Sequence, residues 1–310
     1  GSKTNSQTAT VSFGDIPQVE KFYSHGYYAG GIVGGFAGSG TLGNCYNNAD
    51  VIVSEDYAGG IVGELYANKG EIALISCTNK GYIFGAFDVG GLLGYANIDG
   101  DSNIALYNSQ NKGTVEGYCC VGGLGGYLST GTVLVCLSDG NIIVDVKEDY
   151  CPCGGGLFGE SGYITVADCI SSGTTELCKD ASFGGLINLY EAPQFANCYY
   201  LETLSDFGVI TDNDAPLSSE LEGVYGISAD EMKTQATFTG FDFESMWEMG
   251  SENPELSNAA VSILGDVDLD GIVDKMDYTF VKRVCFETAE LEMGQNLAAD
   301  VNGDGIVDKM

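Results

Sequence analysis

Short apolar runs preceded by paired glycines recur along the first two hundred residues. Each Gly-Gly pair is followed by one or two apolar residues, and the pairs begin at Gly30, Gly59, Gly90, Gly122, Gly155 and Gly184. The steps between them are therefore 29, 31, 32, 33 and 29 residues. A period near thirty with β-type residues and no helical periodicity is typical of stacked coils that cannot bury an apolar face alone. The pattern predicts a mostly β protein whose main part is a parallel β-solenoid of about six coils of ~30 residues.

A second element follows each glycine pair and keeps step with it. Its first two copies read Asn44-Cys45-Tyr46-Asn47 and Ser76-Cys77-Thr78-Asn79. The cysteine position recurs in five copies and is serine in the third: Cys45, Cys77, Ser109, Cys136, Cys169 and Cys198. Free cysteine behaves as a small buried apolar residue, so we expect a ladder of small side chains along the stack.

The two elements together resemble the GLUG repeat of extracellular bacterial adhesin-like proteins. The resemblance covers roughly residues 20 to 200. One departure is Asn188, which replaces the fifth-position glycine of the last copy. The resemblance implies a secreted or surface setting and a role in adhesion, and it implies no known chemistry.

The repeats end near residue 200, and the remaining sequence divides into three parts. We expect the GLUG-like solenoid over 1–200, a cap over 201–250, a linker over 251–260 and a separate module over 261–310. The cap contains a helix start at Ser228 with an acidic first turn, followed by an aromatic run from Phe238 to Trp247. Such a segment could cover the open end of a solenoid, which otherwise exposes unpaired strand edges.

The last fifty residues contain two acidic loops of the kind that bind calcium. In the first loop, positions 1, 3, 5, 9 and 12 are carboxylates and position 6 is Gly271. Ca²⁺ takes six to eight oxygen ligands, and position 7 offers a carbonyl. The expected ligands of the first loop are Asp266, Asp268, Asp270, Ile272, Asp274 and Asp277. The second loop begins thirty-four residues later, and its expected ligands are Asp300, Asn302, Asp304, Ile306 and Asp308. We therefore predict two Ca²⁺ sites.

This duplicated pattern resembles the type I dockerin module, in which position 12 is aspartate, as Asp277 is here. The resemblance implies a small α-helical module that binds a cohesin of a scaffold protein, as in the cellulosome- or amylosome-type complexes of anaerobic bacteria. The residues that match the family's cohesin-binding face are Lys275, Met276, Lys282, Arg283, Lys309 and Met310. Because both copies read Lys-Met, we expect that either copy can face the cohesin. The sequence ends at position 11 of the second loop, so that repeat is expected to be truncated.

The charge of the chain disfavours two classes of partner. The sequence has 44 acidic and 12 basic residues, a net charge of −32. Such a surface repels phosphate backbones and anionic lipid headgroups, so we expect neither nucleic acid nor membrane as a partner. No apolar run reaches the ~20 residues that a membrane span needs. We expect a secreted, extracellular protein associated with a scaffold or a cell surface.

Four further cysteines lie in two pairs near consecutive glycine pairs. Cys120 and Cys153 each lie two residues before a pair, so they should occupy one column on neighbouring coils. We expect a disulfide between them, which a secreted protein permits, and Cys119 with Cys151 could form a second one. A zinc site made of these four residues is the alternative, and the one-residue spacing of Cys151 and Cys153 disfavours it.

The solenoid has no clear catalytic motif. Arg283 is the only arginine and lies outside the repeats, which disfavours a polysaccharide lyase. A glycoside hydrolase needs two carboxylates, and Asp99 with Asp101 or Asp212 with Asp214 could supply them, although aspartate is also common in such turns. His25, the only histidine, has no motif around it. We assign no catalytic residues and keep the hydrolase as the alternative.

A non-catalytic role would use aromatic side chains against polysaccharide or cell-surface glycan. Tyr95 and Tyr127 share one repeat position on successive coils, and Tyr28 and Tyr57 share another. Aromatic ladders also stabilise solenoids, so these residues have a structural interpretation as well. The sequence favours a non-catalytic adhesion or glycan-binding module that is carried to a scaffold.

Overall fold

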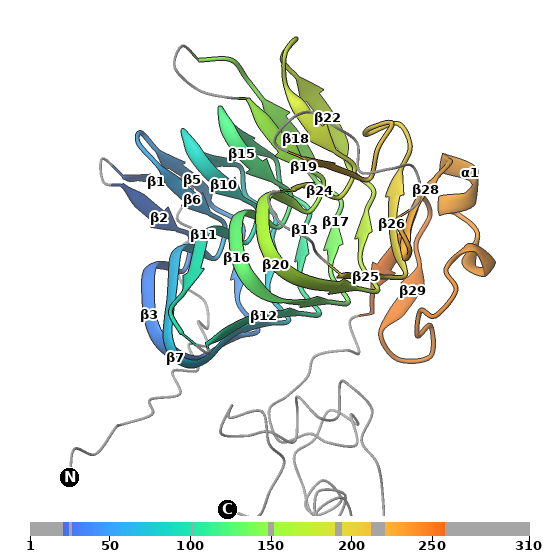
Figure 1. Ribbon diagram of the computed structural model, residues 1–310, viewed down its shortest axis with the longest axis horizontal. Helices are drawn as coiled ribbons and strands as arrows, with labels where there is room; N and C mark the ends of the chain where they lie inside the picture. The colour runs from blue at the N-terminus through green and yellow to red at the C-terminus, as the bar shows by residue number, and fades with distance from the viewer. Residues whose placement is uncertain are drawn as a thin grey trace, which may run out of the picture.

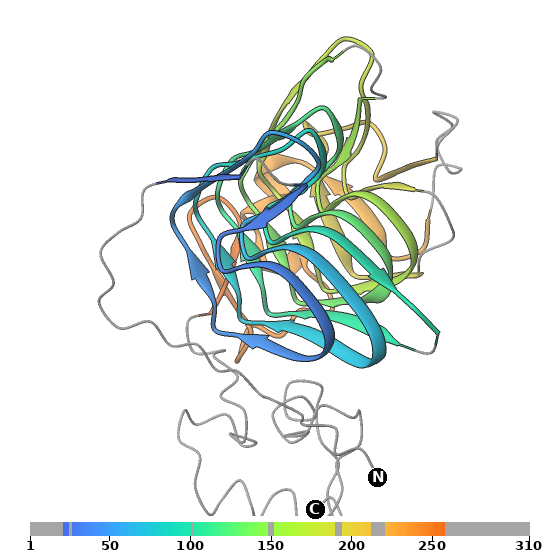
Figure 2. The same cartoon turned by 90° about the vertical axis from the view of Figure 1, so that its left-hand side faces the viewer.

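The protein folds into a parallel β-solenoid, seen in the computed structural model (Figure 1). The structure describes residues 21–24, 27–100, 102–147, 152–189, 194–211 and 221–257. Each coil passes through four sheets in the same order, which we name A, B, C and D, and the view along the stack shows the coils superposed (Figure 2). The prediction of a mostly β, parallel solenoid is confirmed.

The strands of sheets A and B are short and repeat once per coil. Sheet A contains β1 (Lys21–Ser24), β5 (Asp50–Val53), β9 (Ile83–Phe84), β14 (Val115–Gly117), β18 (Asn141–Val144) and β22 (Thr174–Leu177). Sheet B contains β2 (Tyr28–Gly30), β6 (Tyr57–Gly59), β10 (Phe87–Gly90), β15 (Cys119–Gly122), β19 (Cys153–Gly155) and β23 (Ser182–Gly184).

Sheet C holds the long strands, and sheet D the second repeat element. Sheet C contains β3 (Val33–Gly43), β7 (Val62–Ile75), β11 (Leu93–Ile98), β12 (Asn103–Tyr107), β16 (Gly125–Leu134), β20 (Phe158–Ala167), β24 (Ile187–Leu189), β25 (Gln194–Ala196) and β27 (Val209–Thr211). Sheet D contains β4 (Tyr46–Asn47), β8 (Thr78–Asn79), β13 (Gln110–Asn111), β17 (Leu137–Ser138), β21 (Ile170–Ser171), β26 (Cys198–Leu201) and β28 (Val224–Ile227).

The number of turns follows from sheet B, whose six parallel strands are separated by five steps. The solenoid therefore makes about five turns, which is slightly fewer than the six coils expected from the repeats. Helix is scarce: the described residues contain only α1 (Ala229–Met232) and the 3₁₀ turn η1 (Gln235–Thr237). Neither helix is long and apolar enough to cross a membrane. The expected helices of the 261–310 module lie outside the described residues.

The two repeat elements recur with the same period because residues of one element contact residues of the other. The second glycine of each pair lies against the side chain that ends the second element. A Cβ at Gly91 would lie 2.2 Å from Cγ of Asn111 and 2.2 Å from the carbonyl oxygen of Gly123. A Cβ at Gly60 would meet Asn79 in the same way, at 2.5 Å. The glycine is therefore required by close approach of backbone and side chain.

Three of these side chains form a buried asparagine ladder in sheet D. The Nδ2 group of Asn47 donates to Oδ1 of Asn79, and Nδ2 of Asn79 donates to Oδ1 of Asn111, both at 2.8 Å. Asn79 also donates to the carbonyl of Gly81 and accepts from its amide, each at 3.1 Å. The ladder thus ties each coil to the next and closes the turn within each coil.

The cysteine position forms the buried column expected from the sequence, with all five thiols free. The residue before it starts the turn with a left-handed backbone in all six copies: Asn44, Ser76, Asn108, Val135, Asp168 and Asn197, with φ between 48° and 54°. Asparagine and aspartate tolerate this conformation best, which explains their frequency at this position.

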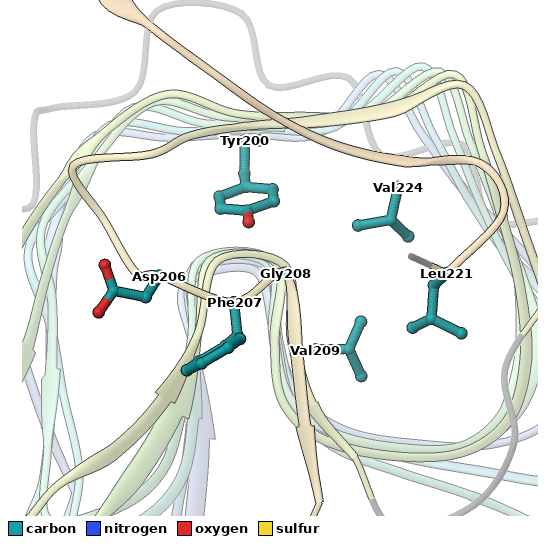
Figure 3. A pocket seen from close by; sticks show the side chains of 8 residues that line it. Tyr200, Asp206, Phe207, Gly208, Val209, Leu221 and Val224 are labelled. Carbon is teal, nitrogen blue, oxygen red and sulfur yellow. The ribbon is translucent and has the colours of Figure 1, made fainter. Parts of the chain in front are cut away.

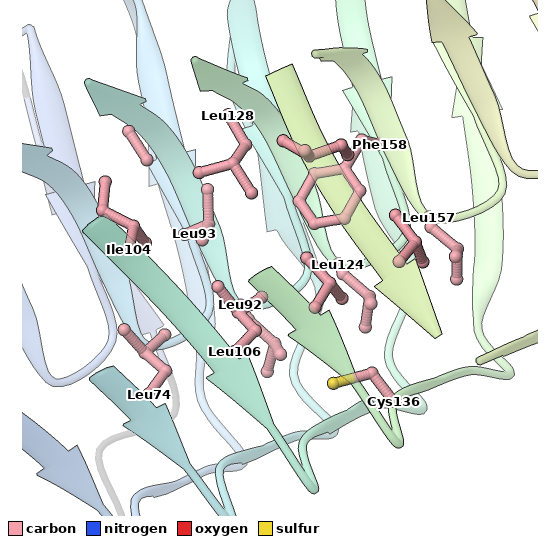
Figure 4. Close-up of a cluster of buried hydrophobic side chains, with 14 of the residues drawn as sticks. Leu74, Leu92, Leu93, Ile104, Leu106, Leu124, Leu128, Cys136, Leu157 and Phe158 are labelled. Carbon is pink, nitrogen blue, oxygen red and sulfur yellow. The ribbon is translucent and has the colours of Figure 1, made fainter. Parts of the chain in front are cut away.

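Stacked aliphatic side chains fill the interior between the sheets. Leu74 lies beside Leu106 of the next coil, and Leu92, Leu124 and Leu157 follow one another on successive coils; all five are fully buried (Figure 4). Each buried aliphatic side chain contributes roughly 1.5–3 kcal/mol relative to an exposed one. The apolar core follows the repeat, because each coil supplies equivalent residues to the same stack.

The aromatic segment after the repeats lies along the side of the stack. Phe238, Phe241 and Trp247 share one buried cluster with Tyr107 of β12 and Tyr199 of β26. Figure 1 shows α1 and β29 (Trp247–Met249) beside β26 and β28, and β29 pairs antiparallel with β30 (Pro254–Leu256). We call residues 238–256 the side strap. The strap thus contacts the side of the stack, and the cap over 201–250 stays a prediction.

Polar contacts fix the side strap to coils far apart in the sequence. The amide of Thr239 donates to the hydroxyl of Tyr199 at 3.1 Å. Lys112 forms an ion pair with Glu255 at 2.7 Å. The strap therefore runs across the coils, from β26 back to the end of β13. The predicted helix start is also present, because Ser228 caps α1 with a reciprocal hydrogen bond to Glu231. The domain boundaries themselves remain predictions.

Candidate functional site

Two columns of side chains face each other where the chain passes from sheet B to sheet C. The first column lies two residues before each glycine pair and contains Tyr28, Tyr57, Asp88, Cys120, Cys153 and Ser182. The second follows the fifth-position glycine and contains Gly35, Glu64, Tyr95, Tyr127 and Glu160. These columns bring aromatic, thiol and carboxyl groups to one edge of the solenoid, beside β10, β15 and β19 (Figure 1).

Tyrosine rings stack along the earlier coils of this edge. The ring centroids of Tyr57 and Tyr95 are 4.7 Å apart, and those of Tyr95 and Tyr127 are 5.1 Å apart, with nearly parallel planes in both pairs. All three side chains are half-buried. The expected alignment of Tyr95 with Tyr127, and of Tyr28 with Tyr57, is present in the strand register. One face of the stack is thus partly open to solvent.

Three thiols converge in the next coils. The Sγ atom of Cys120 lies 3.5 Å from Sγ of Cys119 and 3.6 Å from Sγ of Cys153, and the third separation is 3.9 Å. All three side chains are buried. The amide of Cys120 also donates to the sulfur of Cys153 at 3.3 Å. Strand β15 supplies two adjacent cysteines and β19 supplies the third.

Two carboxyl groups lie against this thiol cluster. The thiol of Cys120 donates to Oε2 of Glu160 at 3.2 Å. Asp88, one coil earlier in the column of Cys120, is only 3% exposed. Burial raises the pKa of Asp88 well above its ordinary value, and the charge of Glu160 raises it further, while a hydrogen bond with Cys120 opposes the shift. The surroundings of Asp88 therefore favour its protonated form more than water does.

The thiols differ in their readiness to ionise. Hydrogen bonds with Cys119 and Cys120 lower the pKa of Cys153 to about 3, against the effect of burial, and the Asn188 side chain contributes a further bond. The same contacts with Cys119 and Cys153, together with burial, raise the pKa of Cys120. These contacts favour the thiolate form at Cys153 and the thiol form at Cys120.

Backbone strain is concentrated at the same place. Besides the six turn residues of sheet D, the described non-glycine residues with a left-handed backbone are Asp88, with φ 46°, and Cys120, with φ 51°. Their main chains lie very close to glycines of the following coil. A Cβ at Gly126 would lie 2.2 Å from the carbonyl carbon of Asp88, and a Cβ at Gly159 would lie 2.2 Å from the carbonyl carbon of Cys120. Such conformations cost of order 1–3 kcal/mol and cluster at functional sites.

The structure brings together only part of the residues that the sequence singled out. Cys120 and Cys153 are neighbours, as expected, but Cys119 lies in the same cluster, and Cys151 is outside the described residues. A disulfide bond is about 2.05 Å long, so the three sulfurs are separate thiols here. The proposed disulfides stay predictions.

Most other candidate residues cannot be placed. All the expected calcium ligands and cohesin-binding residues fall between 258 and 310, which lies outside the described residues. His25, Asp101, Asp212 and Asp214 lie outside the described residues too. Asp99 lies at the turn between β11 and β12, where its carbonyl accepts from Ser102 at 3.0 Å. The neighbourhood of Asp99 thus has a local structural role in the turn.

Sequence analysis missed Asp88, Glu160 and Asn188. Asp88 lies two residues before a glycine pair, the spacing that identified Cys120 and Cys153, and Glu160 occupies the position of Tyr95 and Tyr127. The same rule of spacing could therefore have found both carboxyl groups. Nothing in the repeat indicates that the two columns face each other, which is why their contact was not expected.

A cavity of about 170 Å³ lies where the last coil closes, lined mainly by apolar side chains and Asp206 (Figure 3). Tyr200 stands above it at the position that asparagine or serine occupies in earlier coils. The cavity lacks a cluster of ionisable groups among the described residues, so it offers less chemistry than the thiol and carboxyl cluster.

Comparison with known proteins identifies one family in part of the chain. Residues 264–310 match the model of the dockerin type I domain. No curated protein matches the chain. A solved structure from Bacteroides ovatus, described as a "putative immunoglobulin A1 protease", matches with 20% identity over 77% of this chain and 74% of that chain, at a TM-score of 0.49. This likeness is too low to carry an argument about function.

Proposed function

We propose that this protein is a secreted, non-catalytic component that attaches to a cohesin of an extracellular scaffold through a calcium-dependent dockerin. The observation that carries the proposal is the family match over 264–310, which coincides with the two acidic loops. Dockerin domains bind cohesin modules, and proteins that carry them are typically extracellular. The solenoid is then the cargo that the dockerin delivers.

The dockerin acts by converting ion binding into a shaped surface. In this proposal Asp266, Asp268, Asp270, Asp277, the carbonyl of Ile272 and Asp274 would hold the first ion, and Gly271 would permit the sharp turn of the loop. Neutralising the aspartates lets the loop close and the following helix form, so ion binding and folding are coupled. Lys275 and Met276 then present a basic and apolar contact to the cohesin, and Lys309 and Met310 offer the same contact from the second copy.

Removing calcium should abolish cohesin binding by the full chain. We expect a complex with at least one cohesin of a type I panel in millimolar Ca²⁺, its loss in excess EDTA and its return when Ca²⁺ is restored, measured by calorimetry. Asp268→Ala together with Asp270→Ala should weaken the complex, because the first loop loses two ligands. Asp99→Ala, in a turn of the solenoid, is the matched control and should bind normally. Equal binding with and without Ca²⁺ would contradict the proposal.

For the solenoid, we propose binding of polysaccharide or cell-surface glycan on the tyrosine stack. Tyrosine hydroxyls can donate to and accept from sugar hydroxyls, and Tyr57, Tyr95 and Tyr127 form a continuous, half-buried row whose ring faces pack on one another. Their spacing of about one coil gives a surface that can follow an extended chain. The stack also stabilises the solenoid, so a test must separate binding from folding.

Replacing Tyr95 and Tyr127 with alanine should remove polysaccharide from a pull-down while the far-ultraviolet circular dichroism of the solenoid is retained. Tyr163→Ala is the control, because Tyr163 is 62% exposed and lies outside the stack. Pull-down that is unchanged in the double variant would reject this site. Release of reducing sugar by the wild type would instead support the alternative, a glycoside hydrolase.

A further inference from the structure

We propose that Cys119, Cys120 and Cys153, together with the carboxylate of Glu160, form a zinc-binding site in the solenoid. This site is separate from the calcium loops and does not depend on cohesin binding. Among the described residues, these three cysteines form the only group of three or more metal-ligating side chains whose donor atoms all lie within 4.8 Å of one another. The argument rests on their geometry, their contacts and their surroundings.

The sulfur atoms already have the spacing of a tetrahedral zinc site. Zinc–sulfur bonds are about 2.3 Å long, so a tetrahedral ion holds its sulfurs roughly 3.8 Å apart. The three separations here are 3.5, 3.6 and 3.9 Å. Glu160 lies outside this group of three, and its Oε2 atom contacts Cys120 Sγ at 3.2 Å. Its carboxylate would have to turn toward the ion to fill the fourth position.

The cysteines of the sheet D column contact their neighbours along the stack, but they also donate to main-chain carbonyls and do not converge on one point. Sγ of Cys136 donates to the carbonyl of Leu134 at 3.2 Å, and Sγ of Cys169 donates to Ala167 at 3.1 Å. Sγ of Cys119, in contrast, contacts the other two sulfurs of the cluster. The cluster therefore has a donor set that points inward, which the column lacks.

Acidic groups gather around the cluster. Glu160 accepts from the Cys120 thiol at 3.2 Å, and the buried Asp88 occupies the column of Cys120 one coil earlier. Buried acidic groups are normally paired with positive charge or coordinate a metal. Thiolates are soft ligands that select zinc over Ca²⁺ and Mg²⁺, so the ion of the dockerin loops is a poor occupant here.

Two neighbouring features fit a second shell around the ion. Asn188 hydrogen-bonds to Cys153, and its buried Oδ1 atom has no partner in the described part of the chain. Asp88 and Cys120 share a left-handed backbone, and their side chains hydrogen-bond to each other. Groups of this kind orient the ligands of a metal, and replacing them typically weakens metal binding by 10- to 100-fold.

The test measures zinc bound to the full chain after reduction and removal of metal, with excess Ca²⁺ present to fill the dockerin loops. We expect one tightly bound Zn²⁺ per chain, with release of thiol protons, and a thiolate-to-metal absorption band when Co²⁺ replaces it. Cys120→Ser should abolish stoichiometric binding, and Asp88→Asn should weaken it roughly 10- to 100-fold. Cys136→Ser is the matched control and should bind fully, because Ser109 already occupies that column in another coil.

Several results would overturn the zinc site. It is wrong if reduced wild-type protein binds no zinc beyond the buffer control, or if Cys120→Ser binds as well as the wild type. A cobalt spectrum without a thiolate band also rejects it, and that measurement needs no variant to fold. Loss of two thiols from the cluster on purification, with no zinc bound after reduction, would instead establish a disulfide. Cohesin binding should be unaffected in every case, so failure here leaves the dockerin proposal standing.

Discussion

Replacing Gly91 with alanine is expected to destabilise the solenoid by about 3 kcal/mol or more. The added Cβ would lie 2.2 Å from Cγ of Asn111 and 2.2 Å from the carbonyl oxygen of Gly123. Neither neighbour can give way easily, because Asn111 is held by the asparagine ladder and Gly123 belongs to the backbone of the next coil. The coils would have to move apart locally, which breaks hydrogen bonds between successive coils.

Urea denaturation followed by circular dichroism measures this effect as a fall in the midpoint. Gly34→Ala is the matched control, because Gly34 ends the same glycine motif in the first coil and a Cβ there would meet nothing within 4 Å. We expect the control to unfold near the wild-type midpoint. If the two variants unfold at the same urea concentration, close packing of the repeat is not what requires glycine.

Replacing Asn79 with alanine should cost about 3 kcal/mol of folding free energy. The side chain makes four hydrogen bonds in a fully buried position, to Asn47, to Asn111 and twice to the main chain of Gly81. Its removal leaves buried donors and acceptors unpaired on three consecutive coils, and each unpaired group costs roughly 1–3 kcal/mol. The expected result is a clear fall in the melting temperature of the solenoid.

Asn141→Ala provides the comparison for this prediction. Asn141 also bonds to the next coil, donating to Glu176 at 3.0 Å and accepting from Thr174 at 2.8 Å, but both bonds lie at the exposed surface. Water can replace them, so we expect a change within about 1 kcal/mol. Calorimetry of both variants decides the point: similar melting temperatures would show that the ladder contributes no more than a surface contact.

The repeat allowed the sequence to predict the stack, because equivalent positions of successive coils must lie in register. The columns of glycine pairs, cysteines and tyrosines all follow from this rule, and the structure contains them. The thiol and carboxyl cluster did not follow, since its columns meet across a turn whose shape depends on the left-handed backbone of Asp88 and Cys120. Spacing gives neighbours along the stack, whereas contacts across a coil depend on backbone conformation.

The side strap shows the same limit for residues outside the repeats. Its aromatic composition predicted that it covers apolar surface, which it does, but not which surface. Outward-facing Leu137, Ile170 and Tyr199 in sheet D supply an apolar stripe along the stack, and Phe238 and Phe241 cover it. Burying this stripe gains more apolar contact than covering one end coil. The repeat alone does not predict that the stripe faces outward.

The position of the side strap also has a mechanical consequence. Glu255 is paired with Lys112, so the described chain reaches Ser257 beside the middle coils rather than beyond the last one. Tension transmitted from a scaffold would therefore act first on the strap. Its contacts with several coils would have to break at the same time. Peeling the terminal coil away would need less force, because its hydrogen bonds break one after another. The attachment thus shields the stack from being unravelled at its end.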